Sequence, residues 1–191
     1  MRPETLEPGP SFVVATVGGV VAAILFLALL YGAPGLGLPS VDPLRVLGGV
    51  LATGMDGALA VGAILYLLGA WIVVPVAYVA VWRGLPGGTG LAGAVAKGAV
   101  WGAILWVVLG GVLLPLAGAV NRVAEVTNPG PLAVATGLAG GLLLLLAHLV
   151  YGLALSLVAW LGQGLAPLDT IGWEGYRRAE HRPAPVRRVP P

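Results

Sequence analysis

Four long apolar runs dominate this sequence, and they limit what the chain can fold into more strongly than any motif does. They cover residues 12–31, 57–82, 95–116 and 137–161, and Lys97 is their only charged residue. A helix rises about 1.5 Å per residue, so about 20 apolar residues cross a hydrocarbon core that is roughly 30 Å thick. The runs therefore predict four transmembrane helices.

The composition supports the same class. The chain is 58% hydrophobic and only 9% charged, whereas soluble domains are about one quarter charged. A surface this apolar is suited to lipid rather than to water. We expect an all-α integral membrane protein, with no cysteine to form a disulfide or a thiolate metal site.

A fifth, shorter helix is predicted between the first two runs. Asp42 followed by Pro43 is typical of an N-cap and a first helical position. The helix predicted over residues 43–53 would be too short to cross a membrane. We therefore expect it to be interfacial or re-entrant.

The runs divide the chain into an N-terminal segment, residues 1–11, a four-span domain, residues 12–161, and a basic Pro-rich tail, residues 162–191. The segment before the first run resembles no secretory signal, so we expect a retained span. Four spans place both termini on one side. Eight basic residues would lie on that side and two, Arg45 and Arg122, on the other, which predicts cytoplasmic termini. The eight are Arg2, Arg83, Lys97, Arg177, Arg178, Arg182, Arg187 and Arg188.

The last run has one face of small and weakly polar residues around His148. Tyr151 lies three residues after His148, and the positions at multiples of four from it are Gly140, Leu144, Gly152 and Ser156. Small residues let helices approach closely in lipid, so this face is expected to contact protein. Gly18, Gly98, Gly102, Gly140 and Gly152 are the predicted helix-packing glycines.

His148 and Tyr151 are the candidate binding residues, as a contact to lipid or quinone. A histidine inside a membrane is a candidate haem ligand, proton relay or quinone contact. The alternative is a neutral imidazole hydrogen-bonded to a neighbouring helix. Haem ligation by two histidines would need a second buried histidine, and the only other one, His181, lies in the tail. We therefore predict no cofactor and no metal site.

Other polar residues have simpler explanations. Asp56 is expected to cap the second span, although it could also serve a proton or cation path together with His148. Lys97 is expected to reach the lipid headgroups. The tail arginines Arg177, Arg178, Arg182, Arg187 and Arg188 are expected to contact headgroups or a partner. No enzyme motif is present, so catalysis by the chain alone is not expected.

Two of the runs resemble each other. VGAILYLLGAWIVVPVA, residues 61–77, and WGAILWVVLGGVLLPLA, residues 101–117, align at an offset of 40. They share Gly-Ala-Ile-Leu near the start and Pro-x-Ala at the end, and Pro75 and Pro115 should kink their helices. The pattern is consistent with an internal duplication whose halves run antiparallel.

From Gly18 to Leu161 the chain resembles small four-span prokaryotic membrane proteins of unknown function. The likeness lies in GGVVAAILFLALLYGAPGLGLP, WGAILWVVLGGVLLPLAG and HLVYGLALSLVAW. Such proteins are similar to accessory subunits of haem–copper terminal oxidases, which implies a respiratory setting in a bacterial or archaeal cytoplasmic membrane.

We therefore expect a non-catalytic accessory subunit of a respiratory oxidase or a related electron-transfer complex. Its partners would be other membrane subunits and lipids, with no nucleic acid and no soluble substrate. Two alternatives remain open: an autonomous transporter or channel that uses His148 and Asp56, and a haem- or quinone-binding subunit that uses His148.

Overall fold

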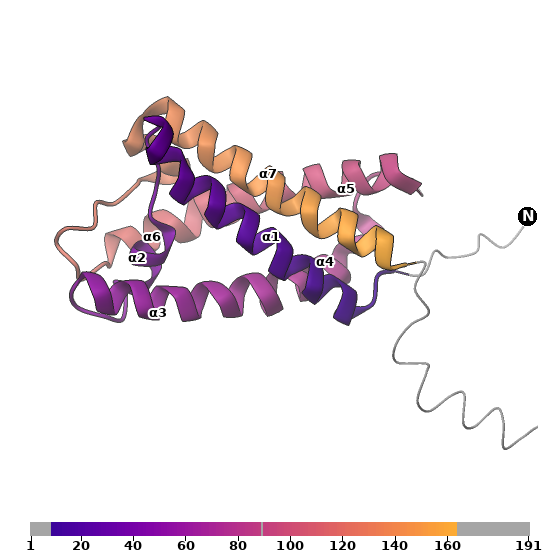
Figure 1. Cartoon of the computed structure of the whole chain (residues 1–191), viewed down its shortest axis with the longest axis horizontal. Helices are drawn as coiled ribbons and strands as arrows, with labels where there is room; N and C mark the ends of the chain where they lie inside the picture. Colours follow the sequence, from indigo (N-terminus) through magenta and orange to yellow (C-terminus); the bar gives the residue numbers. More distant parts are fainter. Residues whose placement is uncertain (1–8, 89, 164–191) are drawn as a thin grey trace, which may run out of the picture.

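The computed structural model describes residues 9–88 and 90–163, and every regular element within those ranges is helical. Four helices are long and apolar enough to cross a membrane: Phe12–Leu36, Met55–Gly84, Gly90–Ala119 and Pro131–Gly162. They lie lengthwise in one bundle (Figure 1). Residues 1–8, residue 89 and most of the predicted tail, residues 164–191, fall outside that description.

Each long helix consists of shorter elements, and each extends beyond the predicted span. The first is α1 (Phe12–Gly32) and the 3₁₀ turn η1 (Ala33–Leu36), and the short helix α2 (Pro43–Gly48) follows. The second is α3 (Met55–Leu68), η2 (Gly69–Val73), α4 (Val74–Val81) and the 3₁₀ turn η3 (Trp82–Gly84). The third is α5 (Gly90–Leu105), η4 (Trp106–Leu113) and α6 (Leu114–Ala119), and the last is the 3₁₀ turn η5 (Pro131–Thr136) and α7 (Gly137–Gly162).

Local sequence explains where the helices begin. The Ser11 hydroxyl accepts the Val14 N–H at the start of α1, and Asp42 caps α2 with Pro43 at its first position, as the sequence predicted. The prediction for Asp56 was wrong. Gly54, with φ of 87°, precedes the first residue of α3, so Asp56 lies inside the first turn. Its negative charge there still favours the helix N-terminus.

The second and third helices share one interruption. Residues Gly69–Val73 and Trp106–Leu113 are π-helical, and a proline is the second residue of the α-helix that follows each. The Val74 N–H donates to the Gly69 carbonyl and the Leu114 N–H donates to the Leu109 carbonyl, five residues back in both cases. A proline ring clashes with the carbonyl four residues earlier, and a wider turn relieves that clash.

Helix α7 is the centre of the packing. It contacts α5 and α1 more extensively than any other helices contact each other, and its own span is half buried within the chain. Helix α3, in contrast, packs mainly on α2. Gly48 of α2 and Gly62 of α3 bring those two backbones together, because a Cβ at either position would collide with the opposite backbone.

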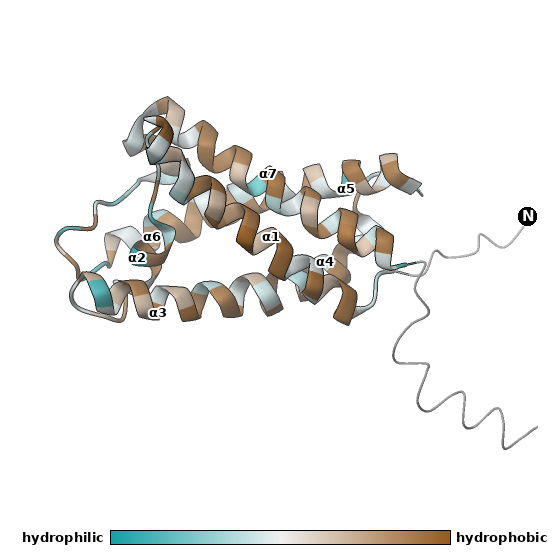
Figure 2. Ribbon diagram, in the orientation of Figure 1, coloured by the Kyte–Doolittle hydropathy of each residue, from teal (hydrophilic) through white to brown (hydrophobic). Residues whose placement is uncertain are grey.

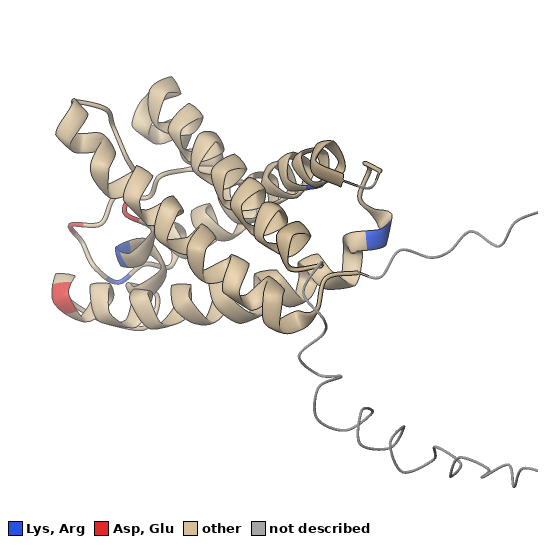
Figure 3. Cartoon of the chain, turned by 45° about the vertical axis from the view of Figure 1, so that its right-hand side comes forward, with Lys and Arg blue, Asp and Glu red and all other residues tan. Residues whose placement is uncertain are grey.

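Helix α2 is shorter than predicted and ends at Gly48. Hydrophobic residues predominate along the helices (Figure 2), and exposed aliphatic side chains occur on every long helix. Charged residues lie toward the ends of the helices and leave the middle of the bundle uncharged (Figure 3).

Candidate functional site: a cavity beside His148

A cavity of about 360 Å³ lies between the second helix and the rest of the bundle. Phe26 from α1, Tyr66 from α3, residues of both π-helical segments, and His148 and Tyr151 from α7 line it. A second hollow of about 80 Å³ shares Phe26, Tyr66 and His148 and extends toward α2 and α6. The larger cavity opens to the surface, because Leu65, Val73 and Leu113 on its wall are exposed. Ligand pockets measure roughly 300–1,000 Å³. The larger cavity falls within that ligand-binding range.

Both π-helical segments contribute residues to the cavity wall. Gly69, Ala70 and Val73 of η2 lie on one part, and Leu109 and Leu113 of η4 lie on another. Single π turns often occur at functional sites. The two halves of the sequence repeat therefore contribute equivalent segments to one cavity.

His148 is buried, with 5% of its surface exposed. Its Nδ1 lies 2.8 Å from the Leu144 carbonyl oxygen. This partner is in its own helix, whereas the alternative to a binding role placed the partner on a neighbouring helix. A carbonyl only accepts, so Nδ1 carries the proton, and the ring is neutral because charge in an apolar cavity is costly. Nε2 is then a bare acceptor, and none of the described residues donates to it. The Phe26 ring packs edge-on against the imidazole, with 4.9 Å between ring centroids.

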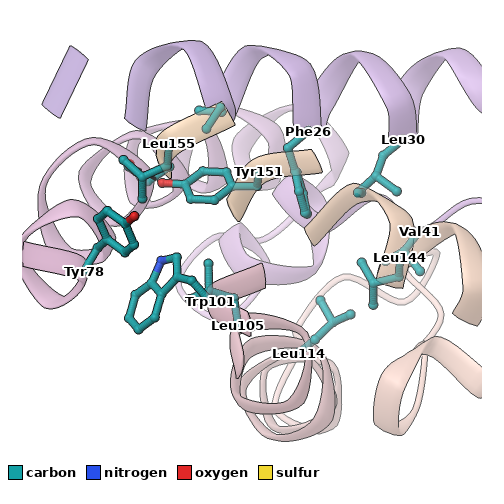
Figure 4. Packing of buried hydrophobic residues seen from close by; sticks show 14 of the residues in the cluster. Phe26, Leu30, Val41, Tyr78, Trp101, Leu105, Leu114, Leu144, Tyr151 and Leu155 are labelled. Atoms are coloured by element: carbon teal, nitrogen blue, oxygen red, sulfur yellow. Dashed lines mark hydrogen bonds between the residues drawn. The ribbon is translucent and has the colours of Figure 1, made fainter. Parts of the chain in front are cut away.

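Tyr151 donates to a carbonyl of the π-helical segment in the second helix. Its hydroxyl donates to the Ala70 carbonyl over 2.6 Å. In a π turn this carbonyl would accept from residue 75, but Pro75 has no N–H. Tyr151 supplies the missing donor, and it lies within the row of buried side chains between Phe26 and Tyr78 (Figure 4).

Tyr66 makes the corresponding contact from α3. Its hydroxyl donates to the Ala23 carbonyl of α1 over 3.1 Å, and its ring stacks on Phe26 with a centroid distance of 5.9 Å. The tyrosine hydroxyls on the cavity wall therefore use their protons on the backbone of other helices. Sequence analysis missed Tyr66 and Phe26, because an aromatic residue in an apolar run carries no signal of its own.

Three of the predicted packing glycines lie between α5 and α7. A Cβ on Gly98 would lie 2.8 Å from the Gly152 carbonyl oxygen, and one on Gly102 would lie 2.5 Å from the His148 carbonyl oxygen. A Cβ on Gly152 would meet the α5 backbone. Gly18 faces Leu155 on α7, whereas Gly140 faces Thr136 and Pro39 rather than another long helix.

The face of α7 around His148 is buried from Gly140 to Ser156. The leucines elsewhere on α7 differ in exposure: Leu142 and Leu146 are exposed, whereas Leu143 is buried in the core. The Ser156 hydroxyl donates to the Ala94 carbonyl of α5 over 2.6 Å.

Two other candidates lie elsewhere. Asp56 is exposed. It precedes the nearest cavity residue on its helix, Leu65, by nine positions, or about 14 Å of helix, so the structure does not bring it to His148.

Lys97 was wrongly predicted to reach the headgroups. It is buried, and its Nζ lies 4.0 Å from the centroid of the Trp82 ring, a cation–π arrangement. The five tail arginines lie outside the described residues.

A separate polar cluster links the ends of α1 and α2. The Tyr31 hydroxyl donates to one Asp42 carboxylate oxygen over 2.6 Å, and the Arg45 guanidinium lies 2.6 Å from the other. Burial alone would raise the pKa of the Asp42 carboxyl. Hydrogen bonds from Tyr31 and from the backbone and side chain of Arg45 outweigh burial and hold that pKa below its usual value.

No group of three or more His, Cys, Asp or Glu side chains is placed to hold a metal ion in residues 9–88 and 90–163.

Residues 10–164 match the model of one protein family, DUF6789, which is described as a family of unknown function. A search of curated proteins and a search of solved structures each find no match.

Proposed function

The chain belongs to DUF6789, a family of unknown function, and we propose that it is an integral membrane protein that acts as a non-catalytic accessory subunit of a larger membrane complex. Its four apolar helices would span a bacterial or archaeal cytoplasmic membrane with both termini in the cytoplasm. Helix α2, packed flat on α3, would be the re-entrant or interfacial helix.

The observation that carries this proposal is the use of the buried polar side chains. Apart from tyrosine and tryptophan, Lys97, His148 and Ser156 are the three in the described part of the chain. Lys97 lies over the Trp82 ring, His148 bonds within α7, and Ser156 joins α7 to α5. In lipid, polar groups of this kind stabilise helix packing. Their arrangement suits a structural subunit better than a polar path for a solute.

The parent complex is a respiratory terminal oxidase or a related electron-transfer assembly in this proposal. That part rests on the resemblance of the first, third and last apolar runs to small four-span prokaryotic membrane proteins of unknown function, which are similar to oxidase accessory subunits. The exposed aliphatic surface would then face lipid and the catalytic subunit, and the tail arginines would contact headgroups or a partner.

Purification from native membranes tests the accessory role. The chain is extracted in mild detergent, and the chains that migrate with it are identified by mass spectrometry. We expect a fixed set of larger membrane subunits, including a haem-bearing chain if the complex is an oxidase. A single monodisperse chain would contradict the proposal.

Reconstitution tests the competing transporter. Liposomes that contain only this chain should show no ion flux above protein-free liposomes. Flux that disappears in His148→Ala, while the variant still folds, would favour transport instead.

A second candidate function is the binding of a membrane-soluble molecule, and the 360 Å³ cavity beside His148 favours it. The two functions are compatible, since an accessory subunit can hold a ligand for its complex. Haem fits this site less well than a lipid-like molecule, because the structure supplies one imidazole and mostly aliphatic walls. A Soret band on the isolated chain would reverse that preference.

A further inference from the structure

We propose that the cavity beside His148 binds a neutral amphiphile through a hydroxyl group that donates to His148 Nε2. The inference rests on the second candidate function, that the cavity is a binding site, and it names the chemistry of the ligand. The supporting observation is that one polar atom on the cavity wall, His148 Nε2, has no hydrogen-bond partner among the described residues.

Only three of the side chains that line the cavity have polar atoms: Tyr66, His148 and Tyr151. Each has already used a proton within the chain. Tyr66 donates to the Ala23 carbonyl, Tyr151 donates to the Ala70 carbonyl, and His148 Nδ1 donates to the Leu144 carbonyl. What remains on the wall accepts hydrogen bonds and donates none.

His148 Nε2 keeps some exposed surface, since it is not among the fully buried polar atoms that lack a partner. A ligand that covered it without a donor would leave it unpaired at a cost, and a ligand that brings a donor avoids that cost. A hydroxyl supplies the donor, whereas an ether or a quinone carbonyl does not. The rest of the wall is aliphatic or aromatic and carries no charge, so the rest of the ligand is hydrocarbon and its head is neutral. Isoprenoid alcohols and alkyl hydroquinones share this chemistry.

The position of His148 is rigidly determined, which suits recognition of one atom. Gly102 allows the α5 backbone to lie directly against the His148 carbonyl. Phe26 packs edge-on against the ring, and the bond to Leu144 orients it. Nε2 is therefore held in place before a ligand arrives, which lowers the entropic cost of binding.

The test compares ligands that differ only in the donor. The full-length chain in lipid nanodiscs is equilibrated with farnesol or farnesyl methyl ether, and bound ligand is measured after subtraction of uptake by empty nanodiscs. A second arm uses a decyl hydroquinone and its dimethyl ether. One hydrogen bond predicts about three- to tenfold tighter binding of the hydroxyl compound. The arm with the larger ratio identifies the source of the hydroxyl.

Three variants locate the effect. His148→Phe removes the acceptor and keeps a ring, so alcohol and ether should bind equally. Gly69→Leu should weaken both, because Gly69 lines the cavity and a Cβ there meets no atom within 4 Å. Ser156→Ala removes a buried hydrogen bond of the same helix away from the cavity, and it should leave the preference unchanged.

Equal binding of alcohol and ether by the unaltered chain would overturn the proposal, as would a preference that survives His148→Phe. If alcohol and ether bind equally and Gly69→Leu abolishes the binding of both, the cavity is still a binding site and only the hydroxyl chemistry is rejected. Absence of binding by all four compounds would reject the binding function itself. Alcohol binding as tight in Gly69→Leu as in the unaltered chain would place the alcohol elsewhere and overturn the proposal even if His148→Phe does not fold.

Discussion

The second and third long helices contain the two halves of one sequence repeat. Their backbone geometry is alike, but their packing against the rest of the bundle differs. Each runs from an α-helix through a π-helical segment to a helix with proline at its second position. The two i→i−5 bonds, from Val74 to Gly69 and from Leu114 to Leu109, differ in position by the 40 residues of the repeat offset. The repeat is therefore visible as shared backbone geometry.

The packing of the two halves differs. The α-helical part of the third helix, α5, lies along α7, where glycines on both sides allow close approach. The corresponding part of the second helix, α3, packs on short α2 instead, and its span is only 17% buried, against 28% for the third. The cavity lies beside the less packed half. The shared sequence pattern thus produces a π-helical segment in both helices, and the packing of neighbouring helices determines whether the space beside that segment is filled.

The largest expected effect is at the close contact of the third helix. Gly152→Leu should destabilise the fold by about 3 kcal/mol or more, because its side chain would collide with the α5 backbone at Gly98 and Gly102. Thermal unfolding in detergent measures this. Gly69→Leu in the second helix is the matched control, since its Cβ has open space, and a similar loss in both would contradict the comparison.

The contact between α1 and the segment around Ala70 and Pro75 in the second helix should tolerate almost no added volume. A Cβ at Gly19 of α1 would lie 2.6 Å from Pro75 Cγ and 2.7 Å from the Ala70 carbonyl oxygen. Gly19→Ala should therefore cost about 1–3 kcal/mol, measured as a lower unfolding temperature. Gly32→Ala on the same helix meets nothing within 4 Å and should be nearly neutral.

Tyr151→Phe should cost about 1–3 kcal/mol, because it leaves the Ala70 carbonyl without a donor. Pro75→Ala restores an N–H five residues after Ala70, so it should reduce the cost of Tyr151→Phe in a double-mutant cycle. Additive effects would mean that Pro75 does not create the need for Tyr151. No described side chain donates to Gly110, the equivalent carbonyl of the third helix.

The smallest expected loss of stability is in the polar cluster of Tyr31, Asp42 and Arg45, which lies outside the repeat. The pKa of the Asp42 carboxyl is lowered in the folded state, so its contribution is complete above the unfolded pKa of about 3.9 and is lost as pH falls through the folded value. Asp42→Asn keeps the cap but loses the ion pair, and should cost about 0.5–1 kcal/mol at pH 7. Unfolding at pH 7 and pH 3 should show a smaller difference for Asp42→Asn than for the unaltered chain.

Part of the candidate site was predicted from the sequence. His148 and Tyr151 were identified because a polar residue in an uncharged run is conspicuous, and three of the packing glycines meet at the α5–α7 contact. Tyr66, Phe26 and the π-helical segments were not identified. Their role depends on which helices stand beside them, and periodicity within one helix does not determine that.

The number and apolar character of the long helices, the Asp42 cap and an interruption of regular α-helix at Pro75 and Pro115 follow from the sequence alone. Each depends on residues within a few positions along the chain, where rise per residue, capping and the missing proline N–H act directly. The burial of Lys97, the partner of the Ala70 carbonyl and the cavity beside His148 were decided by the tertiary structure. Each depends on atoms from helices far apart in the sequence, whose distances only the packing sets.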